Sequence, residues 1–467
     1  MQKNIVEHFD LIVIGSGPAG QKGAIAAAKA GKKVAVIDRL SMVGGVSLHR
    51  GTIPSKTLRE VIIYLSGIRQ RAFYGEDYAV KHEISTSDLA YRVQQVEMRE
   101  MGVIYDQLYR NGIHLHYGLA RFVDEHTVEI ETDDGTLKLH ADHFLIACGT
   151  RPADNPSVPF DGETILNADQ ILNLQRMPRE MIIVGAGVIG LEYGSMFSAM
   201  GVKVTLIDQN SSVLPFVDDE IMELLTGHLQ SHGTNFRLSE TVEKVFKNTD
   251  GLVEVHLSGG LVVKADSFLY AVGRQANSDT LNLNVLKIKT DNRGRIEVND
   301  NFQTEVPHIY AAGDVVGFPA LAATSMEQGR LAACRMFGAP ANYQPEQLPY
   351  GIYAIPEISM IGKTEQELLE QNIPYAIGKS KFVDLARGGI MGVETGMLKI
   401  LFDPESHKLL GVHIIGETAT ELIHIGQAVI SFGGTVEYFR DTVFNYPTLA
   451  EAYKVAALDG LNRLNGV

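Results

Sequence analysis

The sequence has very few cysteines: only Cys148 and Cys334 occur among its 467 residues. Two cysteines in a chain of this length cannot form a disulfide framework, so we expect a reducing compartment, the cytoplasm. Long apolar runs are also missing. No stretch approaches the roughly 20 apolar residues that a membrane-spanning helix needs, and the first residues contain no apolar core of a signal peptide. We therefore expect a cytoplasmic protein with no membrane partner.

Positive charge is in short supply as well. The chain has 41 Lys and Arg against 56 Asp and Glu, which gives a formal net charge of −15. Such a surface repels the phosphate backbone of nucleic acids, so we expect no nucleic-acid partner. The length predicts about three domains at roughly 150 residues each.

One unit of the sequence occurs twice. An apolar run at 9–14 and another at 181–184 each lead into a glycine-rich turn, then a helical stretch, then a second apolar run. The second runs end at Asp38 and Asp208, and each aspartate follows the first glycine of its turn by the same spacing. This is the βαβ dinucleotide-binding pattern, duplicated. The key residues of the two turns are Gly15, Gly17, Pro18 and Gly20, and Gly185, Gly187, Ile189 and Gly190.

The pattern has a physical reason at each position. The first glycine makes the tight turn, the second lets a pyrophosphate approach the backbone, and the third lets helix and strand pack closely. The start of the helix presents N–H groups to the phosphates. Asp38 and Asp208 would accept hydrogen bonds from a ribose, although an aspartate can also simply end a strand. The sequence therefore predicts an α/β fold with two dinucleotide sites.

The rest of the chain gives a coarser prediction. Two further strands end at Gly149 and Gly273, where the backbone can pass close to a ligand. Long helices are expected over 58–110 with a polar interruption at 75–87, and a β-meander over 113–143 with a turn at Asp133-Asp134-Gly135. From 345 onward we expect a separate domain, with strands at 398–402 and 409–415 and helices at 418–432 and 448–464.

Residues 44–56 resemble the active-site segment of the pyridine nucleotide–disulfide oxidoreductases, in which two cysteines form a redox dithiol. Ser47 and Thr52 stand at those two positions here. The resemblance implies that Gly45, Ser47 and Thr52 lie at the flavin, and that Lys56 lies beside flavin N5 and pairs with Glu192. An ammonium there would stabilise the anionic reduced flavin. Residues 309–315 resemble the second FAD motif, in which the aspartate, Asp314 here, binds the ribityl chain. The resemblance also implies that Gly313 lies at the FAD.

Near the C-terminus, Tyr446 replaces the histidine that serves as acid–base in the disulfide reductases, whereas Glu451 is retained. The two thiols and their base are therefore all absent, which indicates that thiol chemistry is not the function. Over essentially its whole length the chain resembles one branch of the family, the soluble, Si-specific pyridine nucleotide transhydrogenases. It departs at Ser47, where that branch usually keeps a cysteine.

This resemblance implies the architecture and the activity. The expected domains are an FAD-binding domain at 1–155 and 276–345, an NAD(P)-binding domain at 156–275, and an α+β dimerisation domain at 346–467. The implied cofactors are FAD, NAD(H) and NADP(H), and no metal site is expected. Hydride would pass between nucleotides through the flavin, with Lys56, Glu192, Tyr446 and Glu451 as catalytic residues. In a homodimer or higher oligomer, the last two would act at the flavin of the other subunit.

Two alternatives stay open. An NADH-dependent diaphorase or quinone reductase fits the same motifs, and so does a non-catalytic FAD-binding interaction protein, although Lys56 and Glu192 argue against pure binding. Nucleotide choice is a further prediction. Asp208 is followed at 209–215 by no lysine or arginine that could bind a 2′-phosphate. Repulsion of about 1–2 kcal/mol predicts roughly a tenfold preference for NADH over NADPH.

Overall fold

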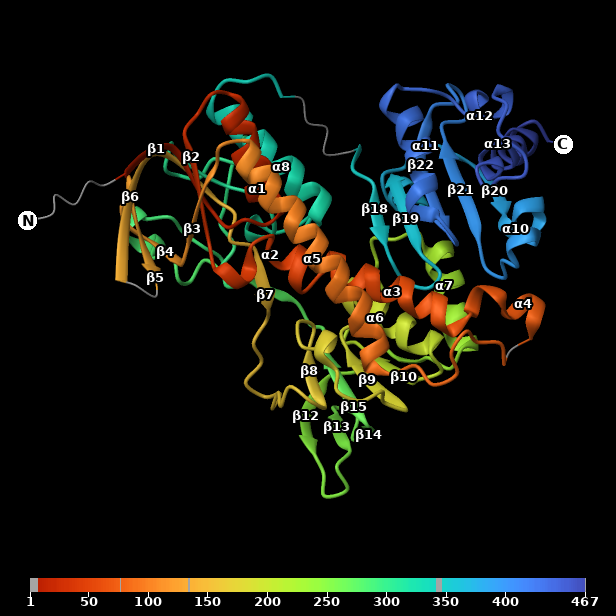
Figure 1. Ribbon diagram of the computed structural model, residues 1–467. Helices are drawn as coiled ribbons and strands as arrows, with labels where there is room; N and C mark the ends of the chain where they lie inside the picture. Colours follow the sequence, from red (N-terminus) through yellow and green to blue (C-terminus); the bar gives the residue numbers. More distant parts are fainter. Residues whose placement is uncertain (1–6, 76, 133–134, 342–346, 467) are drawn as a thin grey trace, which may run out of the picture. The chain divides into compact units, whose positions relative to one another are not determined.

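The computed structural model describes residues 7–75, 77–132, 135–341 and 347–466. The chain forms two compact units, and each is assembled from three separate segments (Figure 1). The first unit takes the described parts of 1–58, 90–155 and 273–343. The second takes those of 59–89, 156–272 and 344–467. Both units combine helices with sheets, as the predicted α/β fold class requires.

A seven-stranded sheet forms the centre of the first unit. Its order is β3-β2-β1-β6-β5-β4, and β17 pairs with β6 as well. Strands β1 and β17 each pair with β6. Strand β2 pairs with β1, and β3 pairs with β2. All four of these pairings are parallel. Apolar side chains of β1 are buried on both faces, as expected of a parallel strand covered on two sides. The strands are β1 (Glu7–Ile14), β2 (Val34–Asp38), β3 (His114–Tyr117), β4 (Leu119–Asp124), β5 (Thr127–Thr132), β6 (Gly135–Ile146) and β17 (Ile309–Ala311).

Two helices, α1 (Pro18–Lys29) and α8 (Ala322–Met336), pack side by side on one face of this sheet (Figure 1). The long helices predicted over 58–110, interrupted at 75–87, are present as α3 (Thr52–Ser66), α4 (Arg71–Tyr74) and α5 (Thr86–Arg110). The short helix α2 (Gly45–His49) precedes them. The short strands β7 (Thr150–Pro152) and β16 (Arg274–Ala276) form an antiparallel pair.

The predicted meander is only partly confirmed. Strands β4, β5 and β6 follow one another in antiparallel pairing, but β3 pairs in parallel with β2. The reason is that α5 provides the long crossover that two parallel strands need, so β3 completes the parallel sheet. Of the predicted turn, Asp133 and Asp134 lie outside the described residues.

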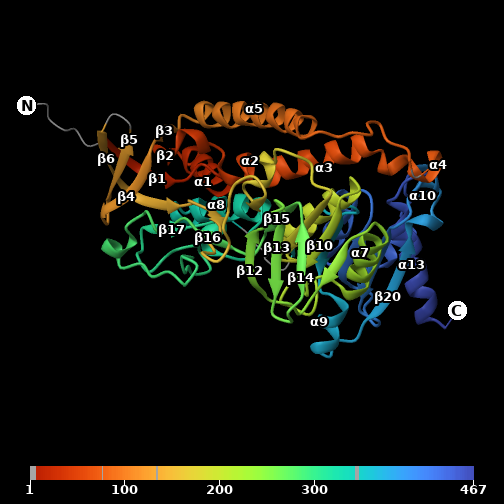
Figure 2. The ribbon, with the colours of Figure 1, turned by 90° about the horizontal axis from the view of Figure 1, so that it is seen from below.

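The second unit contains a five-stranded parallel sheet of order β11-β10-β9-β15-β8. A three-stranded antiparallel sheet, β12-β13-β14, shares a hydrophobic core with it (Figure 2). Helices α6 (Val188–Ala199) and α7 (Asp219–Ser231) belong to the same region. The strands are β8 (Ile165–Asn167), β9 (Glu180–Val184), β10 (Lys203–Ile207), β11 (Asn235–Arg237), β12 (Val242–Lys247), β13 (Val253–Leu257), β14 (Val262–Ala265) and β15 (Ser267–Tyr270).

The C-terminal part of the second unit is a five-stranded antiparallel sheet of order β18-β19-β22-β21-β20. The predicted strands and helices are confirmed, although the last helix begins at Glu451 and not at 448. The three-domain division stays a prediction. The elements are β18 (Tyr350–Ile352), β19 (Ile358–Gly362), α9 (Glu365–Glu370), β20 (Ala376–Lys381), β21 (Met397–Phe402), β22 (Leu409–Ile415), α11 (Ala419–Ser431) and α13 (Glu451–Leu464). Among the helices that the structure describes, none is long and apolar enough to cross a membrane.

Candidate functional site

The first glycine-rich turn joins β1 to α1 in the geometry that the pattern predicts. Gly15 has φ +104°, a left-handed conformation that favours glycine, and its N–H donates to the carbonyl of Ile37 at 2.8 Å. A Cβ on Gly20 would lie 1.9 Å from the carbonyl oxygen of Gly15. The third glycine therefore lets the helix touch the turn. A Cβ on Gly17 would meet only the Cα of Gly45, at 3.8 Å, so its surroundings are open.

The second turn, between β9 and α6, repeats this geometry. Gly185 has φ +103°, and its N–H donates to the carbonyl of Ile207 at 2.8 Å. A Cβ on Gly190 would lie 1.9 Å from the carbonyl oxygen of Gly185, and no atom lies within 4 Å of the corresponding position on Gly187. Ile189 lies in the first turn of α6, as Pro18 does in α1. The sequence repeat is therefore a repeat in three dimensions.

The two strand-end aspartates hold their turns in the same way. Oδ2 of Asp38 accepts hydrogen bonds from the N–H of Ser16 at 2.7 Å and from its hydroxyl at 2.6 Å. Oδ2 of Asp208 accepts from the N–H of Ala186 at 2.6 Å. Burial raises the pKa of Asp38 despite these hydrogen bonds from Ser16. A carboxylate has about four acceptor sites, so a ribose hydroxyl could still donate to either one.

A second polar group lies where β6 and β17 end, side by side. Gly149 follows β6, and the next residue, Thr150, donates its hydroxyl to Oδ2 of Asp314 at 3.2 Å. Oδ1 of Asp314 accepts from the hydroxyl of Ser325 at 3.3 Å, and the N–H of Gly313 donates to Gln328 at 2.9 Å. The carboxyl ends of parallel strands are where α/β sheets bind ligands. Gly149, Gly313 and Asp314, all predicted from sequence, are thus brought together.

Several polar residues of this group were missed by the sequence analysis. Arg274 donates from Nε to the hydroxyl of Thr150 at 2.8 Å and from Nη2 to its carbonyl at 2.9 Å. Gly273 immediately precedes this arginine at the start of β16. No motif singles out Thr150 or Ser325, since hydroxyl residues are common. The available signal was position, because Thr150 and Arg274 each directly follow a predicted glycine.

These residues fit FAD. The open space at Gly17 and the N–H groups at the start of α1 suit a pyrophosphate. The acceptors on Asp38 and Asp314 suit a ribose and a polyhydroxyl chain, respectively. A Cβ on Gly45 would lie 2.7 Å from the Cα of Gly17, so the predicted active-site segment lies directly against the first turn. The second turn, with Gly187 and Asp208, provides the same features for a pyridine dinucleotide.

The predicted dithiol positions carry hydroxyl groups. Ser47 lies in α2, Thr52 is the first residue of α3, and both are half-buried. Cys148 and Cys334 are free thiols. Burial raises the pKa of Cys148 to about 12, which keeps its thiol protonated. Lys56, one turn further along α3, donates to the hydroxyl of Ser55 at 3.3 Å. No pair of thiols is therefore available in the active-site segment.

Glu192 is buried on α6, with 4% of its surface exposed. Its Oε1 accepts a hydrogen bond from the N–H of Tyr353 at 2.9 Å. Ser195, one turn later, donates to the carbonyl of Glu192 at 2.8 Å and accepts from the N–H of Ile355 at 3.0 Å. The carboxylate is thus held in a fixed orientation. Lys56 belongs to the first unit and Glu192 to the second, and their pairing stays a prediction.

Tyr446 and Glu451 are not joined by a hydrogen bond in the described structure. The Tyr446 side chain is exposed, with 72% of its surface accessible. Glu451 is the first residue of α13, and its Oε2 is buried with no hydrogen-bond partner among the residues described. A buried acceptor without a partner costs about 1–3 kcal/mol. The catalytic role of this pair stays a prediction.

Several known proteins are similar to this chain over nearly its whole length. The sequence is 50% identical to the soluble pyridine nucleotide transhydrogenase of Mycobacterium tuberculosis, covering 99% of both chains. It is 45% identical to that of Vibrio vulnificus, covering 98% of this chain and 99% of the other. Among solved structures, LpdA from Mycobacterium tuberculosis matches with a TM-score of 0.89 at 26% identity, covering 97% of this chain and 99% of that one.

A second solved structure, the flavoprotein disulfide reductase RclA from Escherichia coli, matches with a TM-score of 0.85 at 25% identity. The match covers 96% of this chain and 99% of that one. Residues 9–329 match the family described as pyridine nucleotide-disulphide oxidoreductase, and residues 348–457 match its dimerisation domain. On these matches and on the paired glycine turns, the chain belongs to the pyridine nucleotide-disulphide oxidoreductase family.

Proposed function

We propose that this chain is an FAD-dependent oxidoreductase that transfers hydride between pyridine nucleotides, from NADH or NADPH to NAD⁺ or NADP⁺. The observation that carries the proposal is the pair of glycine turns with the same geometry, one in each unit. One turn suits the flavin nucleotide and the other the pyridine nucleotide. Relatives with 45–50% identity that are called soluble pyridine nucleotide transhydrogenases support this activity.

The first unit would hold FAD. The start of α1 would face the pyrophosphate, Asp38 the ribose, and Asp314 the ribityl chain. Bound FAD would supply a ring that accepts a hydride and gives it back. The FAD-binding domain would comprise residues 1–155 and 276–345, with the NAD(P)-binding domain at 156–275. Binding would hold the nicotinamide against this ring, and this positioning would provide most of the acceleration.

Lys56 and Glu192 would act as a pair at the reacting ring. The N–H of Tyr353 donates to Oε1 of Glu192 and helps to orient this carboxylate. The ammonium would stabilise negative charge on the ring electrostatically. Little acid–base chemistry is needed, which agrees with tyrosine at position 446, where the disulfide reductases carry a histidine.

A homodimer would complete the site. Residues 346–467 would form the interface domain, in agreement with the match to the family's dimerisation domain. The exposed ring of Tyr446 and the unpartnered Oε2 of Glu451 would then meet groups of the second subunit. The absent thiols at Ser47 and Thr52 would leave nucleotides, and not disulfides, as the substrates.

Stopped-flow absorbance tests this function. Purified protein would be reduced by NADH and then mixed with either a thionicotinamide analogue of NAD⁺ or a quinone. We expect the nucleotide analogue to reoxidise the flavin rapidly. Reoxidation by the quinone alone would instead identify a diaphorase, and failure to bind FAD would reject both activities.

A matched variant separates the two nucleotide sites. In Gly190→Ala the new Cβ would collide with Gly185, so NADH should no longer reduce the flavin. FAD should stay bound and should still be reduced by dithionite, because the first turn is unchanged. Loss of FAD from this variant would contradict the assignment of the second turn to the pyridine nucleotide.

A further inference from the structure

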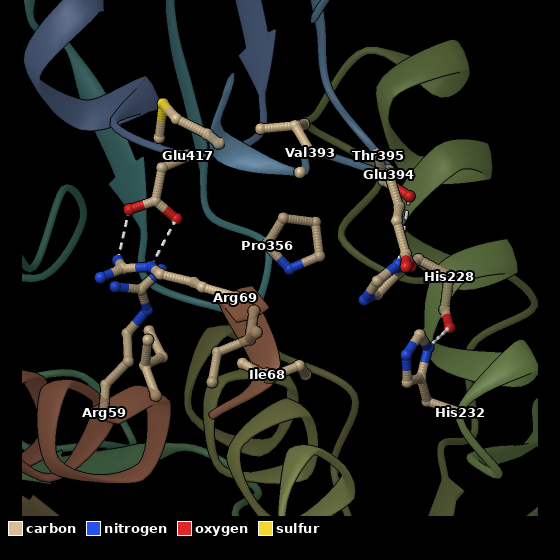
Figure 3. A pocket seen from close by; sticks show the side chains of 14 residues that line it. Arg59, Ile68, Arg69, His228, His232, Pro356, Val393, Glu394, Thr395 and Glu417 are labelled. Atoms are coloured by element: carbon tan, nitrogen blue, oxygen red, sulfur yellow. Dashed lines mark hydrogen bonds and ion pairs between the residues drawn. The ribbon is translucent and has the colours of Figure 1, made fainter. Parts of the chain in front are cut away.

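A cavity of about 110 Å³ lies within the second unit. It is bordered by the C-terminal end of α7, the 59–69 part of the chain and the 391–395 loop (Figure 3). Its middle is apolar, with Ile68, Pro356 and Val393. Figure 3 shows two polar walls on opposite sides of this middle. On one side Arg69 forms an ion pair with Glu417, and on the other side lie two imidazole rings.

The two imidazoles belong to His228 and His232. They are four residues apart at the end of α7, a spacing that places them on the same side of the helix, and their ring centroids are 4.3 Å apart. Nδ1 of His232 contacts the carbonyl of His228 at 2.9 Å, and Nδ1 of His228 contacts the hydroxyl of Thr395 at 3.1 Å. Neither Nε2 atom has a hydrogen-bond partner in the part of the chain that the structure describes.

The protonation state of these rings follows from their neighbours. A carbonyl can only accept, so Nδ1 of His232 carries the hydrogen and Nε2 has a free lone pair. Burial and the adjacent His232 lower the pKa of His228 to about 4, so His228 is neutral at neutral pH. A neutral imidazole whose other nitrogen is held by a carbonyl or hydroxyl is the usual arrangement of a metal-ligating histidine.

A carboxylate lies on the same cavity. Glu394 directly precedes Thr395, its side chain is exposed, and it forms no ion pair with any described residue. In the described chain no three His, Cys, Asp or Glu side chains are already arranged as a metal centre. A change of rotamer at the exposed Glu394 would be needed to bring its oxygens to the two imidazoles. Its negative charge would then offset part of the charge of a cation.

We propose that His228 and His232, joined by Glu394, bind a divalent transition metal ion of the zinc and copper class. Imidazole nitrogen suits these ions, whereas magnesium and calcium prefer all-oxygen sites. Water in the cavity would complete the coordination, as in zinc sites with three protein ligands. Because the ligands come from α7 and from the 391–395 loop, a bound ion would link these two segments.

Calorimetric titration of untagged, FAD-loaded protein with Zn²⁺, after removal of metals by a chelator, tests the proposal. The chain has 15 histidines, so the comparison between variants decides whether the bound Zn²⁺ occupies this cavity. We expect one site whose affinity falls by about tenfold or more in His232→Ala and by a smaller factor in Glu394→Gln. Glu394→His should instead tighten binding, since it supplies a third imidazole. His82→Ala, an exposed histidine outside this cavity, should bind as the wild type does.

Co²⁺ absorption gives a second measurement. Visible bands typical of nitrogen ligation should appear with the wild type and vanish in a double variant, His228→Gln with His232→Ala. Circular dichroism and the flavin spectrum would verify that each variant is folded. The proposal is overturned if the double variant keeps the same Zn²⁺ stoichiometry and affinity, or if Glu394→His leaves the affinity unchanged.

Discussion

Replacing Lys399 by methionine should strongly destabilise the second unit, because Lys399 is a buried cation among three carboxylates. Its side chain is 1% exposed, and Nζ lies 3.0 Å from both oxygens of Asp218, whose side chain is 0% exposed. Nζ also contacts Glu220 at 3.2 Å and Glu365. Methionine has a similar length but no charge, so the variant leaves Asp218 ionised in the interior.

The size of the effect follows from burial. Glu220 and Glu365 are 34% and 29% exposed and can turn toward water, so the penalty falls mainly on Asp218. Removing one partner of a buried ion pair costs about 3–5 kcal/mol. For a unit of this size, roughly 2 °C is lost per kcal/mol. We therefore expect the apparent Tm of Lys399→Met to fall by about 6–10 °C.

A double-mutant cycle with Asp218→Asn measures the pair itself. Far-UV circular dichroism would follow thermal unfolding of Lys399→Met, Asp218→Asn and the double variant. We expect the fall in Tm of the double variant to be much smaller than the sum of the falls in the two single variants, because the double variant does not leave Asp218 as an unpaired buried charge. If the losses are additive, the two side chains do not stabilise each other and the reasoning fails.

The pH dependence has a definite sign. Burial opposes the charge of Asp218, but His413 and Lys399 outweigh it and hold its pKa below the usual value. Burial also opposes the charge of Lys399, but Glu365 and Asp218 raise its pKa. The pair therefore stabilises the wild type between about pH 4 and about pH 10, with losses beyond either end. In Lys399→Met the pKa of Asp218 should rise, so the difference in Tm should shrink toward acid pH.

Three further outcomes are expected. Asp208→Asn should improve flavin reduction by NADPH about tenfold while changing NADH little, because it removes roughly 1–2 kcal/mol of repulsion from a 2′-phosphate; a wild type that already prefers NADPH would contradict this. Gly20→Ala should yield protein without FAD, since its Cβ would lie 1.9 Å from the Gly15 oxygen. Gly102→Ala, which meets no atom within 4 Å, should keep the normal ratio of flavin absorbance to protein. NADH oxidation with lipoamide or glutathione disulfide should stay at background, because Ser47 and Thr52 cannot form a disulfide; robust turnover would refute the assignment of these positions.

The sequence predicted those parts of the molecule in which backbone geometry restricts the choice of residue. Gly15 and Gly20 are recognisable because no side chain fits there, and Asp38 because it ends a strand at a fixed spacing from them. Strand β3 was assigned to the wrong neighbour, since a short apolar run does not reveal whether its partner is the preceding or the following strand.

Other features depend on contacts between distant segments. Lys399 and Asp218 are 181 residues apart in sequence, and a lone lysine in a strand usually indicates a solvent-facing position. Thr150 contacts Asp314 across 164 residues of sequence. The histidines at 228 and 232 have a spacing found in many helices. Only the cavity beside them and the hydrogen bonds of their Nδ1 atoms distinguish these two histidines from other pairs at the same spacing.

The interleaving of the two units constrains how the protein is made. Strand β17 pairs with β6, which in turn pairs with β1. A ribosome adds roughly 5–20 residues per second, so β17 is synthesised on the order of 15–60 s after β1. The sheet of the first unit is thus completed only after much of the second unit has been synthesised. A gene fragment that ends at residue 155 would lack this strand and Asp314, and it should not yield a flavin-binding domain.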